Sequence, residues 1–493
     1  MTDDLCQTTI VIFGASGDLT SRKLIPALYN NFKKDRLSEC TNIVCFARRP
    51  YTDETIREHL LEGLKQFSAE TFDQALWDKF AQLIHYFQGN LDQPEDYAKL
   101  EQYLHGKEDG PANRLYYLAT APEYYIPAVE ALGAAGMAKE TPEAWRRIII
   151  EKPFGIDLKS AHELNHATHA VFEESQVYRI DHYLGKETAQ NILFFRFANT
   201  IFEPVWNRRY VDNVQISVTE TVDVGHRAGY YDEAGVVRDM FQNHLFQLLA
   251  LVAMEAPSSF NADAVRNEKA KVFESIRPIA LEDTVRAQYE GYAQAPGVAE
   301  GSQTPTYAAL KLYVDNWRWK GIPFYLRSGK ALTRKASEIT IEFQRPPHLM
   351  FHMKDDGGFT PNILSMVIQP DEGIHLRFEA KLPDSDGEMR PVDMTFHYRD
   401  SFNGTVLPDA YERLLLEALQ GDASLFNRSD AIESSWKLVD PVIQGWEQQG
   451  IPALTSYARG TWGPTEATNL LARDGRHWRL TDPEKESMVH AGD

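Results

Sequence analysis

Residues 179–187 (RIDHYLGKE) gather side chains that could transfer a proton and bind an anion. If this stretch is helical, His182 and Lys186 share one face, because residues four apart are neighbours on a helix. Two cationic donors on one face suit a phosphate group. Asp181 would then point elsewhere and could pair with another group. The alternative interpretation is a solvated helix held by surface ion pairs.

A histidine in residues 239–249 (DMFQNHLFQLL) is a second candidate for chemistry. The stretch is amphipathic, and at about 100° per residue His244 lies roughly 140° around the helix from Asp239. Histidine can accept a hydroxyl proton near neutral pH, provided that a carboxylate orients it and stabilises its charged form. Asp181 and Asp239 are both candidates for that carboxylate. A hydrogen-bonded structural histidine is the alternative.

Two further cationic segments could bind anions. Lys152 and Pro153 follow residues 147–151 (RIIIE), whose three isoleucines predict a strand. A lysine at the carboxyl end of a parallel strand lies where such sheets bind ligands. Pro153 could set a rigid or cis turn there, although an ordinary strand exit is also possible. Residues 327–335 (RSGKALTRK) hold four cations, typical of a solvated loop or of a phosphate pocket.

A glycine turn near the N-terminus predicts a nucleotide site. Residues 8–13 (TTIVIF) read as a buried strand, residues 14–19 (GASGDL) as a turn and residues 21–32 as a helix. This layout places a pyrophosphate on a helix N-terminus. Gly14 permits the turn, Gly17 allows the backbone to approach phosphate, and Asp18 could cap the helix or contact the ligand. A turn without a ligand is the alternative, since the motif lacks a third glycine.

The second predicted strand, at residues 42–47, ends at Arg48 and Arg49. NAD enzymes place a carboxylate at this position to hold the ribose 2′-hydroxyl. A guanidinium suits a 2′-phosphate instead, and Lys23 in the first helix could reinforce it. The sequence therefore predicts a preference for NADP. A solvated basic loop before Pro50 is the alternative.

Composition limits the possible partners and location. The formal net charge of −20 argues against nucleic acid and against anionic membranes, because both require gathered cations. No apolar run approaches the roughly 20 residues of a membrane span. The first residues are acidic and lack the pattern of a signal peptide. With three cysteines at irregular positions, neither a disulfide framework nor a zinc site is expected, and a cytoplasmic location is the simplest expectation.

The rhythm of predicted elements changes along the 493 residues. Short buried strands alternate with helices up to about residue 190, which predicts a parallel sheet with crossover helices. Beyond that point the strands alternate apolar and polar residues, as in a sheet with one solvated face, and a long helix spans about residues 237–255. We therefore expect an α/β Rossmann domain at 1–185 that binds NADP. An α+β domain at 186–493 with a large, mainly antiparallel sheet would bind the substrate and form oligomers.

Several motifs together resemble the glucose-6-phosphate dehydrogenases. They occur in that family's order and extend across essentially the whole chain, and the RIDHYLGKE run is highly specific for the family. The motifs are GASGDL (14–19), EKPFG (151–155), RIDHYLGKE (179–187), RFAN (196–199), RDMFQNHL (238–245), RSGK (327–330), DAYER (409–413) and GTWGP (460–464).

The resemblance implies that the protein oxidises D-glucose 6-phosphate at C1 to 6-phospho-D-glucono-1,5-lactone with hydride transfer to NADP, the first step of the oxidative pentose phosphate pathway. It implies that His244 is the general base and that Asp181 orients it. The nicotinamide carries the hydride, so no metal is expected. The residues that the resemblance assigns to glucose 6-phosphate are Lys152, His182, Tyr183, Lys186, Glu220, Asp239, Lys330 and Lys335. Those assigned to the cofactor are Gly14, Ala15, Ser16, Gly17, Asp18, Leu19, Lys23, Arg48, Leu91, Asp92 and Lys152.

The chain departs from the family's eukaryotic members at their second, structural NADP site. Ala336, Thr340 and Val367 stand where three of that site's cations would lie, so a second NADP is not expected. Family members form dimers or dimers of dimers, and a homodimer or homotetramer is expected here. Two alternatives stay open: a related two-domain oxidoreductase that acts on unphosphorylated sugars, and an inactive NADP sensor.

Overall fold

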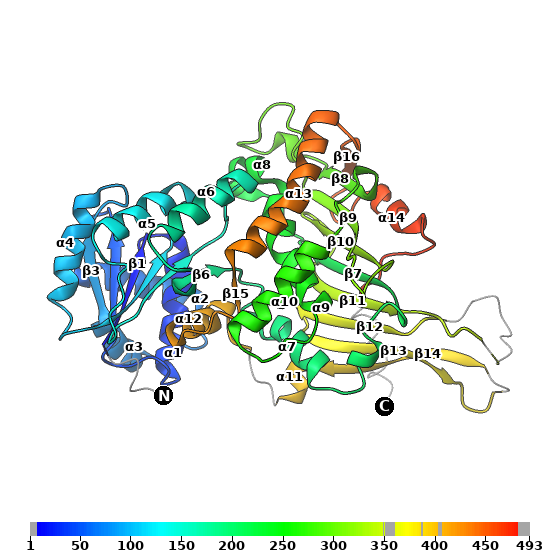
Figure 1. Cartoon of the computed structure of the whole chain (residues 1–493), viewed down its shortest axis with the longest axis horizontal. Helices are drawn as coiled ribbons and strands as arrows, with labels where there is room; N and C mark the ends of the chain where they lie inside the picture. The colour runs from blue at the N-terminus through cyan, green and yellow to red at the C-terminus, as the bar shows by residue number, and fades with distance from the viewer. Residues whose placement is uncertain (1–6, 349, 351–359, 386–387, 403–406, 482–493) are drawn as a thin grey trace. The chain divides into compact units, whose positions relative to one another are not determined.

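The computed structural model describes residues 7–348, 350, 360–385, 388–402 and 407–481 (Figure 1). The acidic N-terminal residues on which the signal-peptide expectation rests lie outside these ranges. The chain divides into two compact units. The first comprises Met1–Lys186, Pro257–Asn267 and Pro408–Glu433, and the second comprises Glu187–Ala256, Glu268–Leu407 and Ser434–Asp493. The first change of unit falls one residue after the predicted boundary. The two later segments of the first unit, however, lie within the range predicted for the second domain.

The first unit contains a seven-stranded sheet with the order β15-β6-β5-β4-β1-β2-β3. All neighbouring strands are parallel except β15, which pairs antiparallel with β6. Without β15, this order is that of doubly wound dinucleotide-binding sheets, so the predicted Rossmann fold is confirmed. The strands are β1 Thr8–Phe13, β2 Asn42–Ala47, β3 Ile84–Gln88, β4 Asn113–Leu118, β5 Arg146–Ile150, β6 Val177–Ile180 and β15 Phe426–Asn427.

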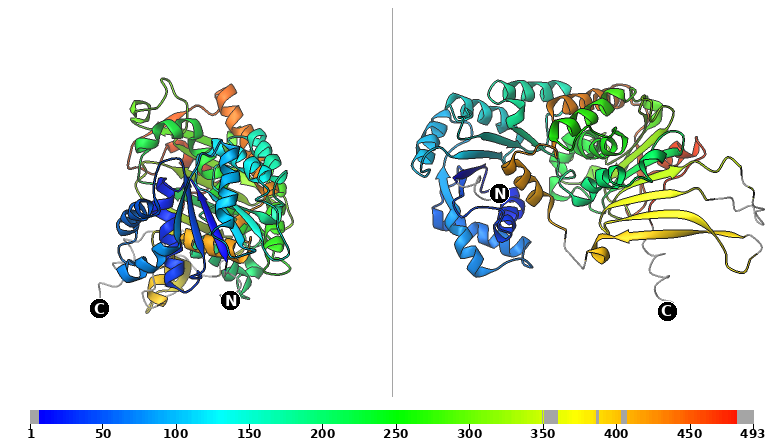
Figure 2. Two further views of the ribbon diagram at one scale, coloured as in Figure 1. Left: turned by 90° about the vertical axis from the view of Figure 1, so that its left-hand side faces the viewer. Right: turned by 60° about the horizontal axis from the view of Figure 1, so that its bottom comes forward.

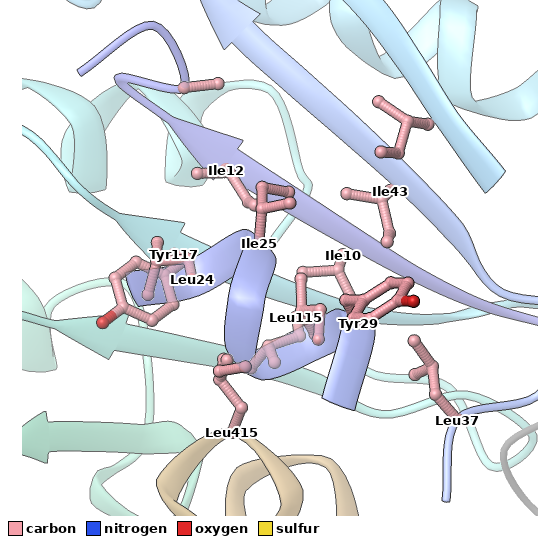
Figure 3. Packing of buried hydrophobic residues seen from close by; sticks show 14 of the residues in the cluster. Ile10, Ile12, Leu24, Ile25, Tyr29, Leu37, Ile43, Leu115, Tyr117 and Leu415 are labelled. Carbon is pink, nitrogen blue, oxygen red and sulfur yellow. The ribbon is translucent and has the colours of Figure 1, made fainter. Parts of the chain in front are cut away.

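Helices cover both faces of this sheet (Figures 1 and 2), which explains why β1 is buried along its whole length. One face carries an apolar core that includes residues of α1, α2, α3 and α12, and Figure 3 shows Leu415 of α12 among them. The helices of the unit are η2 Thr20–Leu24 (π), α1 Ile25–Lys33, α2 Asp53–Phe67, α3 Gln74–Phe80, η3 Ala81–Leu83, α4 Pro94–His105, η4 Pro122–Tyr124, α5 Tyr125–Ala134, α6 Leu158–His169, η5 Glu174–Gln176 and α12 Ala410–Gln420.

The second unit contains a nine-stranded sheet with the order β14-β13-β12-β11-β7-β10-β9-β8-β16. Only the pairs β7–β10 and β8–β16 are parallel among the described strands, so the predicted, mainly antiparallel sheet is confirmed. The strands are β7 Val211–Thr219, β8 Thr284–Tyr289, β9 Tyr307–Tyr313, β10 Pro323–Gly329, β11 Ala336–Phe343, β12 Ile363–Gln369, β13 Gly373–Lys381, β14 Met389–His397 and β16 Thr455–Tyr457.

The predicted long helix is a π-helix, η8, followed by an α-helix, α9. Among the described helices, none is long and apolar enough to cross a membrane. The helices of the second unit are α7 Glu187–Phe197, η6 Glu203–Val205, η7 Gly225–Arg227, α8 Ala228–Val236, η8 Val237–Leu245, α9 Phe246–Ala253, η9 Leu281–Asp283, η10 Tyr292–Gln294, α11 Tyr398–Ser401 and α14 Thr465–Ala472, and both units contribute residues to α10 Ala262–Ser275 and α13 Ser429–Gln449.

The polar face of β7 is covered rather than solvated, so the prediction of one wet face is wrong for this strand. Gln215 is 1% exposed, because residues near the C-terminus run across it. The side-chain amide of Gln215 donates to the carbonyl of His477 at 3.0 Å and accepts from the amide of Arg479 at 2.7 Å. The alternation of apolar and polar residues along β7 therefore means that both faces of the strand are buried. One face packs in an apolar core, and the other forms hydrogen bonds with residues near the C-terminus.

Candidate active site

Two predicted cofactor residues, Gly14 and Arg48, and the predicted catalytic residue Asp181 lie at one edge of the sheet of the first unit. Gly14 follows β1, Arg48 follows β2, and Asp181 follows β6. Because these strands are parallel, their carboxyl ends share an edge, which is where doubly wound sheets bind ligands. The fold thus brings together, on one side of one unit, motifs spread over residues 14–186.

The turn after β1 has a shape that requires glycine. Gly14 has φ +84°, and a Cβ at this position would lie 2.3 Å from the carbonyl oxygen of Ala119. The amides of Gly14 and Ala15 both donate to the carbonyl of Phe46, at 2.9 and 3.1 Å, which ties the turn to β2. A helix begins at Asp18 directly after the turn. Its N-terminal amides can therefore face an anion at the strand edge, and the residues present fit a dinucleotide pyrophosphate.

The other predicted cofactor residues differ in how far their side chains are exposed to solvent. Arg48 is exposed at the end of β2, where its guanidinium is accessible to a ligand. The ammonium of Lys23 lies 2.6 Å from Asp409. Leu91 and Asp92 follow β3, with Leu91 half-buried and Asp92 exposed. Among the turn residues themselves, Ala15 is buried, Ser16, Gly17 and Leu19 are half-buried, and Asp18 is exposed and pairs with Arg22 at 3.2 Å.

Lys152 lies in a tight turn at the end of β5, and its bond to Pro153 is cis, one of the two geometries that the sequence allowed. The residue before it, Glu151, is 7% exposed. The hydroxyl of Tyr117 donates to Glu151 at 2.6 Å. Burial raises the pKa of the Glu151 carboxyl above its usual value, although the hydrogen bonds from Tyr117 and Tyr411 and the charge of Lys152 oppose this shift.

Residues 181–186 form a turn between β6 and α7, so the condition under which His182 and Lys186 would share a helix face is not met. Asp181 is 1% exposed, and its carboxylate accepts from the amide of Tyr183 at 2.9 Å, which favours a turn over a helix. The ammonium of Lys186 lies 4.2 Å from the ring centroid of Tyr183. His182 is half-buried beside Tyr183, with ring centroids 5.0 Å apart. The cations are thus gathered by the turn and its tyrosine rather than by a helix face.

In the second unit, Glu220 follows the last residue of β7, and Lys330 follows the last residue of its parallel neighbour β10. The ammonium of Lys330 lies 2.5 Å from the Glu220 carboxylate. Lys335 is exposed just before β11, whose first residue pairs with Thr219 at the same end of β7. Three of the predicted sugar-phosphate residues therefore share one end of this sheet.

The π-helix η8 carries Asp239 and His244 and packs against β7 and β10. His244 is 1% exposed, and its backbone amide donates to the Asn243 side chain at 2.6 Å. The estimate of about 140° between Asp239 and His244 assumed an α-helix. In a π-helix each backbone amide bonds to the carbonyl five residues earlier. Asp239 and His244 therefore lie nearer to one face of η8 than an α-helix would place them.

Tyr231 joins this group, although the sequence did not indicate it. The ammonium of Lys330 lies 5.0 Å from the centroid of its buried ring. Burial, and then the negative charges of Asp239 and Glu220, hold the pKa of the Tyr231 hydroxyl well above its usual range. Tyr231 therefore stays protonated and presents an aromatic face to the lysine. Tyr117, whose hydroxyl donates to Glu151 at 2.6 Å, was also missed, because it precedes that residue by 34 positions in the chain.

A doubly wound sheet with a glycine turn is joined to an α+β unit in which the helix of the buried His244 packs against the strands that lead into Glu220 and Lys330. Together these features define the class of two-domain nicotinamide-dependent oxidoreductases. Residues 11–191 match the family model for the NAD-binding domain of glucose-6-phosphate dehydrogenase. Residues 193–479 match the model for its C-terminal domain. The chain belongs to the glucose-6-phosphate dehydrogenase family.

Individual relatives agree over nearly the full length. The chain is 46% identical to the glucose-6-phosphate 1-dehydrogenase of Aggregatibacter actinomycetemcomitans, over 95% of this chain and 97% of that one. It is 43% identical to the enzyme of Chlamydia muridarum, over 95% and 96%. A solved glucose-6-phosphate dehydrogenase in complex with glucose 6-phosphate superposes with a TM-score of 0.89 at 35% identity, covering 96% of this chain and 99% of that one.

Proposed function

We infer that this protein oxidises D-glucose 6-phosphate at C1 to 6-phospho-D-glucono-1,5-lactone and transfers the hydride to NADP, the first step of the oxidative pentose phosphate pathway. Membership of the family over both of its domains carries this inference. The phosphate-binding candidates argue against the alternative of an oxidoreductase for unphosphorylated sugars. The presence of both His244 and Asp181 argues against an inactive sensor.

We propose that His244 is the general base that removes the proton from the C1 hydroxyl. Its burial keeps competing water away and suits a group that must accept one defined proton. Asp181 supplies the carboxylate that orients this base and stabilises its charged form. Asp239 and Glu220 hold sugar hydroxyls by accepting their hydrogen bonds.

The 6-phosphate is proposed to bind cations and a phenol. His182, Tyr183 and Lys186 lie within one turn of the first unit, where Lys186 is held over the tyrosine ring. Lys330 and Lys335 are also proposed as ligands of the sugar phosphate. Lys330 pairs with Glu220 at 2.5 Å, so that pair can bind a hydroxyl and an anionic oxygen together.

NADP accepts the hydride from C1 when it is bound. Gly14 and Gly17 would let its pyrophosphate approach the backbone, and Arg48 would pair with its 2′-phosphate. Ala15, Ser16, Asp18, Leu19, Lys23, Leu91 and Asp92 complete the proposed cofactor set, and Lys152 would contact both cofactor and substrate.

Three further properties are proposed. A homodimer or homotetramer follows from the family, and light scattering would establish which forms. A single NADP per chain follows from Ala336, Thr340 and Val367 in place of cations, and calorimetric stoichiometry tests it. A cytoplasmic location agrees with the two cysteines of the described residues, Cys40 and Cys45, which are both free thiols.

One assay tests the reaction directly. Initial rates are measured with glucose 6-phosphate and with glucose, each with NADP and with NAD. We expect a strong preference for glucose 6-phosphate with NADP. Equal rates with glucose would favour the sugar oxidoreductase instead, and no turnover with any pair would favour the sensor.

A further inference from the structure

We propose that Tyr86 is a positioning residue for the cofactor preference of this protein, because it fixes the loop that carries Arg48 and Arg49. The inference rests on the proposed function, since it concerns how the guanidinium assigned to the 2′-phosphate is placed. Tyr86 lies on β3, the strand that pairs with β2, and both strands belong to the first unit.

The loop that follows β2 contains neither helix nor strand. Arg48, Arg49 and Pro50 are all exposed, and they lead from the last residue of β2 toward α2. An arginine side chain is long and flexible, so the position of its guanidinium depends first on how firmly its backbone is held. A loosely held loop would spread the guanidinium over many positions and would weaken a bidentate contact with phosphate.

Three consecutive carbonyls at the end of β2 accept hydrogen bonds from side chains of β3. The hydroxyl of Tyr86 donates to the carbonyl of Ala47 at 2.8 Å and also to that of Arg49. The side-chain amide of Gln88 donates to the carbonyl of Arg48 at 3.0 Å. The path of the backbone is therefore fixed at Arg48 and on both sides of it.

Of these two donors, Tyr86 makes the stronger contribution. Its side chain is buried, whereas Gln88 is exposed to competing water. A hydrogen bond in a buried position is costly to lose, because the group left behind has no water to bond with. Burial also raises the pKa of the Tyr86 hydroxyl to about 12, so the phenol stays protonated and keeps donating.

Tyr86 also contacts the chain beyond the loop. Its backbone amide donates to the carboxylate of Asp53, the first residue of α2, at 2.6 Å. Its ring packs edge-on against that of Tyr51, with centroids 5.6 Å apart. Because Tyr86 contacts the chain before, within and after the Arg48 loop, it can set the shape of that loop rather than follow it.

The same end of β2 holds the glycine turn. The carbonyl of Phe46 accepts hydrogen bonds from two amides of that turn. The next carbonyl, that of Ala47, accepts the hydrogen bond from Tyr86. The turn assigned to the pyrophosphate and the loop assigned to the 2′-phosphate are therefore tied to neighbouring residues. NADP must match the spacing of both, whereas NAD has no 2′-phosphate to place.

The test compares Tyr86→Phe with Tyr116→Phe, each made in the wild-type background and in the Arg48→Ala background. Tyr116 is a matched control, because its buried hydroxyl donates to the carbonyl of Met137 at 2.8 Å, outside the Arg48 loop. Dissociation constants for NADP and for NAD are measured on each variant, and their ratio reports how well the 2′-phosphate is recognised. Thermal midpoints confirm that each variant is folded.

We expect the preference for NADP over NAD to fall about two- to tenfold in Tyr86→Phe, the range for one hydrogen bond, and to keep its wild-type value in Tyr116→Phe. In the Arg48→Ala background, Tyr86→Phe should cause no further fall, since Tyr86 acts through Arg48.

An unchanged preference in Tyr86→Phe, an equal fall in Tyr116→Phe, or a further fall when Tyr86→Phe is added to Arg48→Ala would overturn the inference. A merely structural role would weaken both cofactors equally and would leave the preference unchanged. Arg48→Ala with its preference intact would instead overturn the proposed 2′-phosphate contact, so the two failures are distinguishable.

Discussion

Lys330 and Glu220 directly follow the paired last residues of two parallel neighbouring strands, β10 and β7. The ammonium of Lys330 lies 2.5 Å from the carboxylate of Glu220. This pair should act as one unit in the sugar-phosphate pocket. Lys330→Met should raise KM for glucose 6-phosphate by about tenfold to hundredfold, because a charge-assisted contact is lost. In a cycle with Glu220→Gln, the two effects should be non-additive by about 0.5–3 kcal/mol. Strict additivity would mean that the two residues bind independently.

His244→Asn should lower kcat by about 10²–10⁴-fold, because proton removal loses its base. The affinity for glucose 6-phosphate, measured by calorimetry, should change little. His166→Asn is a suitable control, since His166 is an exposed histidine on α6 and has no proposed role. Unchanged turnover in His244→Asn would remove this residue as the base.

Arg48→Ala should weaken NADP much more than NAD, because the guanidinium is proposed to meet the 2′-phosphate that only NADP carries. Dissociation constants for both cofactors, measured on the same variant, provide the internal control. An equal loss for both cofactors would contradict the 2′-phosphate assignment. The contribution should also weaken as salt concentration rises, because Arg48 is exposed.

The segment that covers β7 should become detached in acid. Burial opposes ionisation of Asp212 and Asp474, but hydrogen bonds from Arg476 and from Lys311, respectively, outweigh it and lower both pKa values. A carboxyl whose pKa is lowered on folding stabilises the fold above its unfolded pKa, about 3.9 for Asp, and this stabilisation is lost as pH falls through the folded pKa. The stabilisation should therefore be complete near neutral pH and fade below about pH 4.

Trp478 reports on this detachment, since its indole donates to the carbonyl of Ala467 at 2.9 Å. Its fluorescence, obtained as the difference from Trp478→Phe, should shift to the red below pH 4. Arg476→Met, which removes the partner 2.6 Å from Asp212, should move that shift to higher pH. An emission that is the same in Arg476→Met and wild type at every pH would contradict the assignment.

Much of the first sheet could be predicted because burial leaves a clear signature in sequence. The expected strand at 42–47 matches β2 at both ends, since a continuous apolar run stops at Arg48. The turn at 181–186 could not be predicted in this way. Charged residues there suit a helix surface equally well, whereas the turn is closed by contacts such as that of the Asp181 carboxylate with the Tyr183 amide.

The parts of the fold and of the candidate site that were not predicted depend on contacts between residues far apart in the sequence or on helix geometry, which no local sequence pattern encodes. A π-helix and an α-helix can share the same amphipathic residues, so the true angle between Asp239 and His244 on η8 was hidden. The hydroxyl of Tyr117 on β4 donates to Glu151 at the end of β5, and this contact joins segments 34 positions apart. The solvated face expected for β7 was wrong because the covering residues come from near the C-terminus.

The late position of α12 and β15 in the chain has a consequence for biosynthesis. When residues 1–186 have left the ribosome, the first unit still lacks Pro408–Glu433, and with it the strand that pairs with β6. Until then the edge of β6 and the apolar surface that receives Leu415 stay uncovered. Exposed edges and apolar surfaces invite association between nascent chains. A ribosome that stalls before residue 433 would therefore hold an incomplete nucleotide domain, which makes chaperone binding during synthesis an expected requirement of this topology.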